Sequence, residues 1–541
     1  MNPFEFSIDD IQLDDNLCSI KTNVVNYMPN GCKNIYITKT GAFINFEFLN
    51  IQYKNNKQNN NNKQNNNNEE YIIALHKLIK KIANYFTLHS KTITGVRKQL
   101  KCCIVDKANK RIIVPRFGIF EILNKNFGLI NFTTCCQINK GINPITPFKW
   151  IGTQTDNQKL ISTEILNKHY KRTMFGSAGV IVNLEAGQGK SYLAAYLISV
   201  IQKKTAIILH TTALIDQWTK VLNNALENVS IGYYYAKKKK DGDIMLFIID
   251  SASFDEFVIN GKKYKAIEFY NQFGFIILDE CHMYSNKKAM KALKSAQAPY
   301  MLGLSATPDE HINGYDKAVW WSIGPVLNAH NINGYINTSE NFSAKVHRIM
   351  YYGHSDYTKN IINKYTQMVS VSETVNMICN DKYRMQVILN CIIKGLDLGL
   401  YMFVFADRRD YLSDLRKLLV DKYSICGEII NSDEDFVRVV GGDKSNALEQ
   451  AELKSKVIFT TYQYMGTGKS VVKMNGLVLA TPRKSKMKQY INRIFRLGSD
   501  ENITRHIWDI CDMRIKLSTQ WSTRLSYYTS KNYDINVEKI K

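Results

Sequence analysis

Two short stretches of this chain carry glycine, lysine and serine in an order that can hold a phosphate group. The first reads EAGQGKSYL at residues 185–193, and the second reads YMGTGKSVV at residues 464–472. In a phosphate loop, a strand leads into a glycine-rich turn and a helix begins at once, so that backbone N–H groups face the anion. The sequence around each stretch therefore decides between them.

The flanking segments favour the first stretch as the nucleotide loop. The apolar run GVIVNL enters it, and SYLAAYLISVIQ leaves it with apolar residues at helical spacing. After the second stretch, SVVKMNGLVLA predicts another strand, so no helix begins at Lys469 and Ser470. We assign nucleotide binding to the first loop, although Leu184 stands where the general pattern begins with glycine; its residues are Leu184, Glu185, Ala186, Gly187, Gln188, Gly189, Lys190 and Ser191.

An acidic pair supplies the other half of this chemistry. The segment FIILDECH ends a buried strand with Asp279 and Glu280. Asp279 can hold Mg²⁺ together with the Ser191 hydroxyl, and Lys190 can reach the β- and γ-phosphates. Glu280 can orient and deprotonate the attacking water. ATP and Mg²⁺ are therefore the expected cofactors.

Composition points to a polyanionic partner. The 541 residues include 71 Lys and Arg against 48 Asp and Glu, which gives a net charge of +23 and a pI near 9.3. A generally lysine-rich, solvated surface is the alternative. No apolar run reaches the roughly 18 residues that span a bilayer, so no membrane is expected. The eleven scattered cysteines favour reduced thiols in a cytosol-like compartment, and the adjacent pairs lack the spacing of zinc ligands.

Four segments can be distinguished along the chain. Residues 1–146 predict an N-terminal accessory domain with a disordered, Asn-rich insertion at 54–68. From 147 to 330, short apolar strands alternate with helix-length segments, and residues 331–510 repeat that alternation. Residues 511–541 are interpreted as a C-terminal tail. We predict an α/β fold with two tandem parallel-sheet domains behind a small α+β domain.

A series of motifs resembles superfamily 2 helicases and translocases from about residue 147 to 510. In chain order, the segments that carry this resemblance are LEAGQGKS, TTALIDQW (211–218), DSAS (250–253), DECH (279–282), SAT (305–307), FVFADRRDYLSDL (403–415), VIFTTYQYMGTGKSV and QYINRIFR (489–496). The resemblance implies two RecA-like domains with ATP bound between them. It also interprets the second GKS stretch as motif V, so its likeness to a phosphate loop is a coincidence.

The resemblance assigns further roles by motif position. Arg493 and Arg496 would stabilise charge on the γ-phosphate, whereas Ser470 and Asn492 depart from the usual Asp and Gly. Gln158 stands where related enzymes read adenine; a polar helix-start residue is the alternative. Coupling between nucleotide and nucleic acid would involve His282, Ser305, Thr307 and Gln489; for His282, a satisfied core histidine is the alternative.

Nucleic-acid contacts are expected mainly at phosphates. The candidates by motif position are Thr211, Thr212, Ser253, Arg409 and Thr460. For each hydroxyl, an ordinary strand-end or helix-cap hydrogen bond is the alternative. The lysine run at 236–243 is interpreted as a solvated hairpin tip more readily than as a nucleic-acid groove.

Within the superfamily, the segment YMLGLSATPDE and the DECH box resemble the viral branch, which includes the poxvirus transcript-release helicase. This likeness implies an ATP-dependent DNA or RNA helicase or translocase in viral transcription, with viral RNA polymerase as a candidate partner. The implied location is the cytoplasmic viral factory, or the virion. A nucleic-acid-stimulated ATPase in genome repair, recombination or packaging is the main alternative. A small-molecule kinase and a non-enzymatic binding subunit fit the motif series less well.

Overall fold

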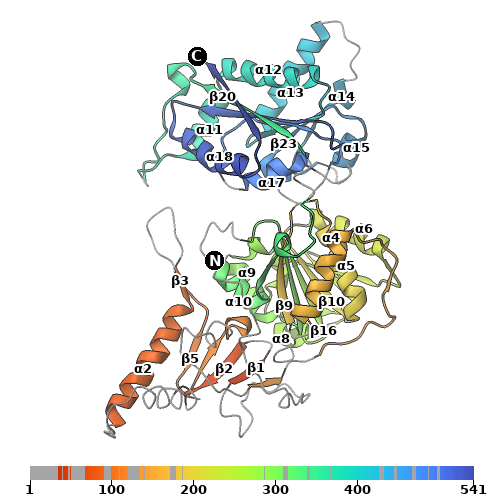
Figure 1. Cartoon of the computed structure of the whole chain (residues 1–541), viewed down its shortest axis with the longest axis vertical. Helices are drawn as coiled ribbons and strands as arrows, with labels where there is room; N and C mark the ends of the chain where they lie inside the picture. The colour runs from red at the N-terminus through yellow and green to blue at the C-terminus, as the bar shows by residue number, and fades with distance from the viewer. Residues whose placement is uncertain are drawn as a thin grey trace. The chain divides into compact units, whose positions relative to one another are not determined.

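The computed structural model describes most of the chain as two compact units (Figure 1). Unit 1 contains residues 1–185 and 189–335, and unit 2 contains residues 336–541 with residues 186–188. The residues described are 35–38, 41–46, 49, 68–89, 99–108, 110–119, 134–137, 140–170, 178–185, 187–285, 287–308, 315–337, 342–365, 367–425, 432–443, 447–465, 471–484, 486–495 and 500–541. The predicted disordered insertion at 54–68 lies outside these residues, apart from Asn68.

The N-terminal part of unit 1 is a small α+β module. A five-stranded sheet has the order β5-β6-β2-β1-β7. Its members are β1 Ile35–Thr38, β2 Gly41–Asn45, β5 Ile104–Asp106, β6 Arg111–Val114 and β7 Thr134–Gln137. Helix α2 (Asn68–Tyr85) buries Ile79 and Ile82 against this sheet, while β3 (Thr87–His89) and β4 (Gln99–Lys101) form a separate antiparallel pair.

The larger part of unit 1 is built on an eight-stranded sheet with the order β13-β12-β14-β10-β17-β18-β9-β19. Every neighbouring pair is parallel except β12 and β13. The strands are β9 Ala178–Asn183, β10 Thr205–Leu209, β12 Ile231–Tyr235, β13 Lys238–Lys240, β14 Ile244–Ile248, β17 Phe275–Asp279, β18 Tyr300–Ser305 and β19 Val326–Asn328. The lysine run thus includes an exposed hairpin strand, as the sequence predicted.

Helices cover both faces of this sheet because its apolar strands are buried on both sides. Helices on one face are α4 Asp156–Glu164, α5 Lys190–Ile201 and α6 Ala213–Ala225. Those on the other are α7 Ile249–Ala252, α8 Ala266–Tyr270, α9 Lys287–Ser295 and α10 Asp316–Ile323. Two short pairs complete the unit: β8 (Lys149–Trp150) with β11 (Leu226–Glu227), and β15 (Glu256–Ile259) with β16 (Lys262–Lys265).

The predicted boundary at residue 146 does not separate two independent units. The Phe86 and Trp321 rings lie 4.6 Å apart, with Phe86 from the N-terminal module and Trp321 from α10. Arg116 Nη1 donates to the Ala298 carbonyl at 2.7 Å, and Phe117 packs in the same core as Ile181 of β9. These contacts place part of the accessory region inside the hydrophobic core of the neighbouring domain.

Unit 2 has a seven-stranded sheet with the order β22-β23-β21-β24-β25-β20-β26, in which all pairs are parallel. Its strands are β20 Ala344–Tyr351, β21 Met402–Ala406, β22 Phe436–Val439, β23 Val457–Thr461, β24 Gly476–Leu479, β25 Arg505–Asp512 and β26 Asp534–Ile540. One face packs against α12 Lys382–Asp397 and α13 Arg409–Ile425. The other packs against α15 Ala447–Lys454, α16 Tyr462–Met465, α17 Met487–Ile491 and α18 Gln520–Ser530 (Figure 1).

The prediction of a C-terminal tail at 511–541 was wrong. These residues complete β25 and form α18 and the edge strand β26, which pairs with β20 over seven positions from Lys345 to Tyr351. Trp521 and Tyr528 of α18 are buried in the core of unit 2. Short apolar runs such as DINVEKI are ambiguous in sequence, and only the pairing with β20 identifies this one as a strand.

Candidate nucleotide site and the second sheet edge

The first GKS stretch has the geometry of a phosphate loop. Strand β9 ends at Asn183 and α5 begins at Lys190, so the loop joins a buried strand directly to a helix. Gly187 and Gly189 have φ values of 89° and 74°, which glycine adopts without the strain that a side chain would impose. The ammonium of Lys190 donates to the Leu184 carbonyl at 3.1 Å and so lies folded over the loop. Ala186 lies outside the described residues.

Gln158 packs against this loop from the start of α4. It is buried, and its side-chain Nε2 donates to the Gly189 carbonyl at 3.1 Å. Its Oε1 accepts the Thr155 N–H at 2.9 Å, and the Thr155 hydroxyl accepts the Gln158 N–H at 3.2 Å, which forms a capping box. A Cβ at Gly189 would lie only 2.2 Å from Gln158 Nε2, so the two positions are fitted to each other. Gln158 is therefore a polar residue at a helix start, which was the alternative weighed for it, and it also contacts the phosphate loop.

The acidic pair lies at the carboxyl end of β17, in the same sheet as β9. Asp279 ends β17, which pairs with β18, and β18 pairs with β9. Asp279 and Glu280 are 7% and 9% exposed. Burial, followed by the charge of Glu280, raises the pKa of Asp279 to about 6, while Trp218 and Lys190 act in the opposite direction. Within the described residues no ion pair reaches Asp279, so its charge is left for a cation.

Trp218 is a contributor to this site that sequence reasoning missed. Its indole Nε1 donates to Asp279 Oδ2 at 2.8 Å, and the Glu280 N–H donates to Asp279 Oδ1 at 3.0 Å. Both carboxylate oxygens of Asp279 are therefore oriented. Trp218 lies in α6 within the TTALIDQW motif, in which only Thr211 and Thr212 were predicted to be functional. Only the packing of α6 against β17 reveals the contact.

A second polar chain runs from the acidic pair to the end of β18. His282 Nδ1 lies 3.0 Å from Ser305 Oγ and 3.4 Å from Glu280 Oε2, and Ser305 Oγ accepts the Thr307 N–H at 3.0 Å. His282 is buried and its Nδ1 has a hydrogen-bonding partner, as expected if it is a core histidine, which was the alternative weighed for it. The same geometry links three of the four predicted coupling residues. The fourth, Gln489, is buried in α17 of unit 2.

The candidate nucleic-acid residues differ in their accessibility. Thr212 is exposed at the start of α6, and Thr211 is partly buried. Ser253 Oγ donates to the Asp250 carbonyl at 2.7 Å, which is the ordinary cap bond weighed as the alternative. Thr460 is fully buried within β23, so its prediction as a contact was wrong for this side chain. The motif position in the sequence did not show that this side chain points into the sheet.

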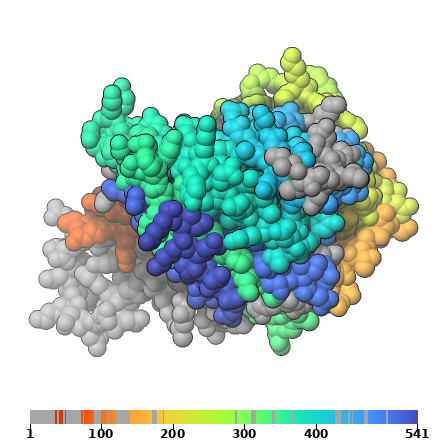
Figure 2. Space-filling view, turned by 90° about the horizontal axis from the view of Figure 1, so that it is seen from above, coloured from red at the N-terminus to blue at the C-terminus, as the bar shows by residue number. Residues whose placement is uncertain are grey.

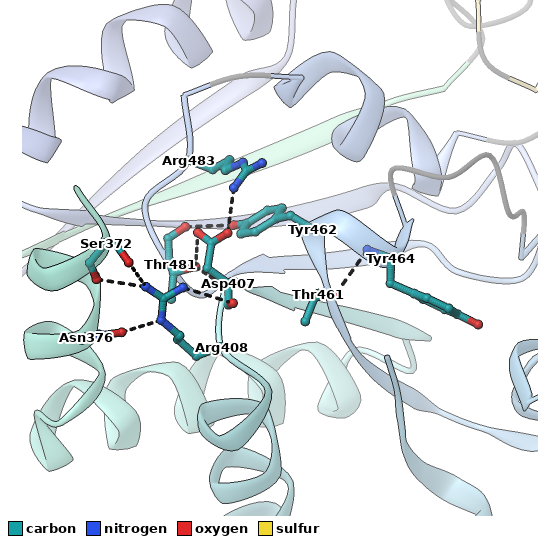
Figure 3. A network of polar contacts seen from close by, with 9 residues as sticks. All are labelled: Ser372, Asn376, Asp407, Arg408, Thr461, Tyr462, Tyr464, Thr481 and Arg483. Carbon is teal, nitrogen blue, oxygen red and sulfur yellow. Dashed lines mark hydrogen bonds and ion pairs between the residues drawn. The ribbon is translucent and has the colours of Figure 1, made fainter. Parts of the chain in front are cut away.

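Unit 2 presents a basic network at the carboxyl edge of its sheet (Figure 3). Arg408 Nη2 donates to the Ser372 carbonyl and hydroxyl at 2.9 and 2.8 Å, and its Nε donates to Asn376 Oδ1 at 2.5 Å. Arg483 Nη1 forms an ion pair with Asp407 at 2.8 Å. The adjacent Arg409 is exposed at the start of α13 and remains available to a ligand.

The two arginines predicted to act on phosphate are placed differently. Arg493 is buried and donates through Nη2 to the Met465 carbonyl at 2.6 Å, which ties motif VI to motif V within unit 2. Arg496 lies outside the described residues, as do Lys469 and Ser470. Described chain resumes at Val471 and enters β24 at Gly476, so the strand predicted after the second GKS stretch is confirmed.

Comparison with known proteins identifies the family. Residues 153–310 match the family model described as type III restriction enzyme, res subunit. African swine fever virus has a protein, named ATP-dependent RNA helicase QP509L, that is 30% identical over 395 residues, covering 69% of this chain and 72% of the relative. This chain belongs to the viral branch of the superfamily 2 helicases. Its activity is accordingly that of an ATP-dependent helicase.

More distant relatives extend this helicase family. The mimivirus protein named ATP-dependent RNA helicase L396 is 24% identical over 406 residues, covering 72% of this chain and 70% of that protein. Transcript termination protein A18 of Yaba-like disease virus is 24% identical over 411 residues, covering 71% and 76%. Among solved structures, T4 UvsW aligns with 86% of this chain and 96% of its own at 18% identity and a TM-score of 0.34.

The described residues also bear on the other features expected from the sequence. The cysteines at 102, 103, 281, 379, 391 and 511 are all free thiols. In the part of the chain that the structure describes, no group of three or more His, Cys, Asp or Glu side chains is arranged to hold a metal ion. None of the described helices combines the length and apolar character needed to cross a bilayer.

Proposed function

We propose that this helicase uses ATP and Mg²⁺ to act on RNA during viral transcription, including release of the transcript. The observation that supports this most directly is the match over about seventy per cent of the chain to viral proteins named for RNA helicase and transcript termination activity. The excess of 23 positive charges suits a partner that is a nucleic acid. Viral RNA polymerase is the proposed protein partner, and the viral factory or virion is the proposed location.

Unit 1 provides the residues for the nucleotide. Backbone N–H groups of residues 187–191 would cradle the phosphates, and Lys190 would exchange its Leu184 carbonyl for the β- and γ-phosphates. Asp279, oriented by Trp218, and Ser191 would hold Mg²⁺, which lowers the barrier by neutralising charge on the phosphate oxygens. The fit is good because Asp279 is a buried carboxylate that forms no ion pair among the described residues, and it ends β17 in the same sheet as β9, from which the loop leaves.

Glu280 is the proposed base for the attacking water. Its φ of 48° places it in the left-handed region, which is costly for a residue with a side chain and is found mostly where function requires it. That conformation follows the last residue of β17 and begins the turn Cys281–Tyr284. Arg493 and Arg496 are proposed to stabilise charge on the γ-phosphate, and Gln158 to contact adenine.

Nucleic-acid-stimulated ATP hydrolysis tests this proposal. We expect single-stranded RNA to stimulate hydrolysis, and RNA–DNA hybrids or RNA duplexes with a tail to be separated with ATP. Glu280→Gln should bind ATP with near wild-type affinity and lower turnover on the order of 100-fold, because only the water-activating group is lost. Lys190→Ala is the matched control that loses both binding and turnover.

Two results would contradict the proposal. Strand displacement only on DNA duplexes would move the substrate class to DNA. Stimulated hydrolysis without displacement on any duplex would favour the alternative, a nucleic-acid-stimulated ATPase in genome repair, recombination or packaging.

A further inference from the structure

A short hairpin leaves the sheet of unit 2 after β20 and presents a tyrosine to solvent. It comprises residues 361–370, of which all but Thr366 are described, and we call it the tyrosine hairpin. Tyr365 at its tip is 97% exposed, Ile362 and Met368 of the same hairpin are each 44% exposed, and Val371, the first residue of α11, is 50% exposed. Single exposed apolar residues are ordinary on proteins, whereas several in one short segment suggest a surface that suits a ligand.

The exposure of Tyr365 occurs on an ordered backbone. The Asn363 N–H donates to the Met368 carbonyl at 2.8 Å, and the Ser370 N–H donates to the Ile361 carbonyl at 2.7 Å. Asn363 Oδ1 then accepts the Tyr365 N–H at 2.9 Å, which fixes the tip itself. Local hydrogen bonding therefore holds the ring out in water, where an unconstrained loop could fold it against the surface.

The hairpin belongs to the same sheet edge as Arg408 and Arg409. All strands of this sheet run parallel, so β20 and β21 end at one edge, where ligands of open α/β sheets bind. Helix α11 (Val371–Cys379) begins directly after the hairpin, and its Ser372 and Asn376 hold the Arg408 guanidinium (Figure 3). The space-filling view shows the green to blue-green segment after β20 standing out from unit 2 (Figure 2).

Positive charge lies in the chain just before the exposed ring. Lys359 and Lys364 both precede Tyr365 and are exposed. Asn360 Oδ1 accepts the Lys516 N–H at 2.8 Å, which brings the exposed Lys516 and Arg514 to the same segment. Among the described residues, none of these four side chains forms an ion pair. The nearby acids are Asp356, which pairs with His354 at 3.2 Å, and Glu373.

This combination distinguishes between classes of ligand. Proteins that bind single strands stack bases on aromatic rings and contact phosphates with lysine and arginine. A protein-docking tip would bury its aliphatic side chains and avoid lysines, which are depleted at protein interfaces. A fully exposed ring that directly follows a lysine, in a segment whose lysines form no ion pair among the described residues, favours the nucleic acid.

We propose that the tyrosine hairpin contacts single-stranded nucleic acid, with Tyr365 stacked on a base and Lys359 and Lys364 at phosphates. This contact lies outside every helicase motif recognised in the sequence, and it rests on the proposed function only in requiring a single-stranded substrate. It would extend the binding surface from Arg409 along the carboxyl edge of the sheet.

The test is binding of a fluorescein-labelled oligouridylate and its DNA counterpart to the full chain. Tyr365→Ala and Tyr365→Leu should each weaken binding roughly tenfold, whereas Tyr365→Phe should bind as wild type, because stacking needs only the ring. Tyr383→Ala is the matched control: it removes another exposed tyrosine, 57% exposed on α12, and should leave binding unchanged. Lys359→Gln with Lys364→Gln should reduce the salt dependence, by about 0.7 in slope for each phosphate that a lysine no longer neutralises.

The outcomes separate this proposal from the proposed function. Wild-type affinity in both Tyr365→Ala and Tyr365→Leu, with wild-type melting temperatures, would overturn the contact and leave the hairpin as a docking tip for a protein. Wild-type chain whose ATP hydrolysis responds to no RNA or DNA would overturn the proposed function. Equal losses in Tyr365→Ala and Tyr383→Ala would show a general surface effect and also contradict the hairpin contact.

Discussion

The carboxyl edges of the two large sheets both carry a buried aspartate, but the partners of the two aspartates differ. In unit 1, the buried Asp279 has a tryptophan N–H and a backbone N–H for partners, and burial raises its pKa to about 6. In unit 2, the buried Asp512 receives both Nε and Nη2 of Arg384 at 2.6 and 3.0 Å. A buried acid without an arginine is poised to accept a metal ion, whereas a bidentate pair is already satisfied. The carboxyl edge of the first sheet therefore has a buried acid that is open to a cation, and the carboxyl edge of the second has a buried acid with a structural partner.

Variants in the two GKS stretches give the strongest test of the difference between the two sheet edges. Lys190→Ala should lower ATP turnover on the order of 100-fold, because one preorganised positive charge on the transferred phosphate is lost. Lys469→Ala should leave ATP affinity unchanged, since a strand and not a helix follows that stretch. Nucleotide affinity measured by fluorescence of a labelled ATP analogue checks both variants. Equal losses would give each unit its own nucleotide loop.

Most elements of the carboxyl edge in unit 1 could be predicted from the sequence, because each lies in a short continuous segment. The phosphate loop, β17 and Asp279 lie in continuous runs where strand, turn and helix signals follow one another, and the structure confirms those elements. Contacts between distant segments were not predictable in this way. Trp218 reaches Asp279 across 61 positions, and β26 pairs with β20 although nearly two hundred residues separate them.

Other failures have a similar cause. Thr460 lies in β23, a strand that is buried along its whole length, and its motif position in the sequence could not show that burial. The docking of Phe117 against Ile181 depends on the fold of both segments, so a boundary near residue 146 looked reasonable from composition.

The free energy of unfolding tests how two arginine–aspartate pairs of unit 2, one buried and one more exposed, differ in their contribution to stability. Arg384 is fully buried, and it also donates to Tyr411 and to the Ala480 carbonyl at 3.0 and 2.8 Å. Arg384→Met should lower the free energy of unfolding by about 3–5 kcal/mol, because Asp512 is left buried and unpaired. Arg483→Met breaks the more exposed pair with Asp407 and should cost less than about 1 kcal/mol. Urea unfolding followed by tryptophan fluorescence compares them, and similar losses would contradict the structural role of Arg384.

Trp218→Phe probes whether the indole N–H prepares Asp279 for Mg²⁺. Phenylalanine keeps an aromatic ring in the core against α6 and removes the hydrogen bond to Oδ2, together with part of the buried ring volume. We expect the Mg²⁺ concentration for half-maximal ATP hydrolysis to rise roughly tenfold, since a hydrogen bond to a charged group contributes about 1.5–3 kcal/mol. The rate at saturating Mg²⁺ should change much less. Trp150→Phe, which alters another tryptophan of unit 1, is the control.

A lowered rate at saturating Mg²⁺ without a shift in the Mg²⁺ requirement would give Trp218 a packing role only. Mg²⁺-dependent binding of a nonhydrolysed ATP analogue provides a readout that does not depend on turnover.

The smallest expected effect concerns two histidines on the neighbouring strands β20 and β25 of the second sheet. His347 Nε2 and His506 Nδ1 lie 2.9 Å apart on neighbouring strands, and both rings stack with Trp508. Burial, then the charge of His506 and of Lys345 and Lys394, lowers the pKa of His347 to about 4, with Glu538 acting in the opposite direction. Burial likewise lowers the pKa of His506.

These shifts predict a specific pH dependence of stability. Between pH 6.5 and about 4, the unfolded chain binds a proton at His347 that the folded chain does not, so the free energy of unfolding falls as the pH is lowered through that window. The ring is only half buried, and solvent screening should keep the loss at about 1 kcal/mol. His347→Gln should remove that part of the dependence, whereas His76→Gln, at an exposed position on α2, should not. Urea unfolding at pH 7 and pH 5 measures the difference, and a His347→Gln variant that loses as much stability as wild type would show that protonation of His347 in the unfolded chain is not the source of the loss.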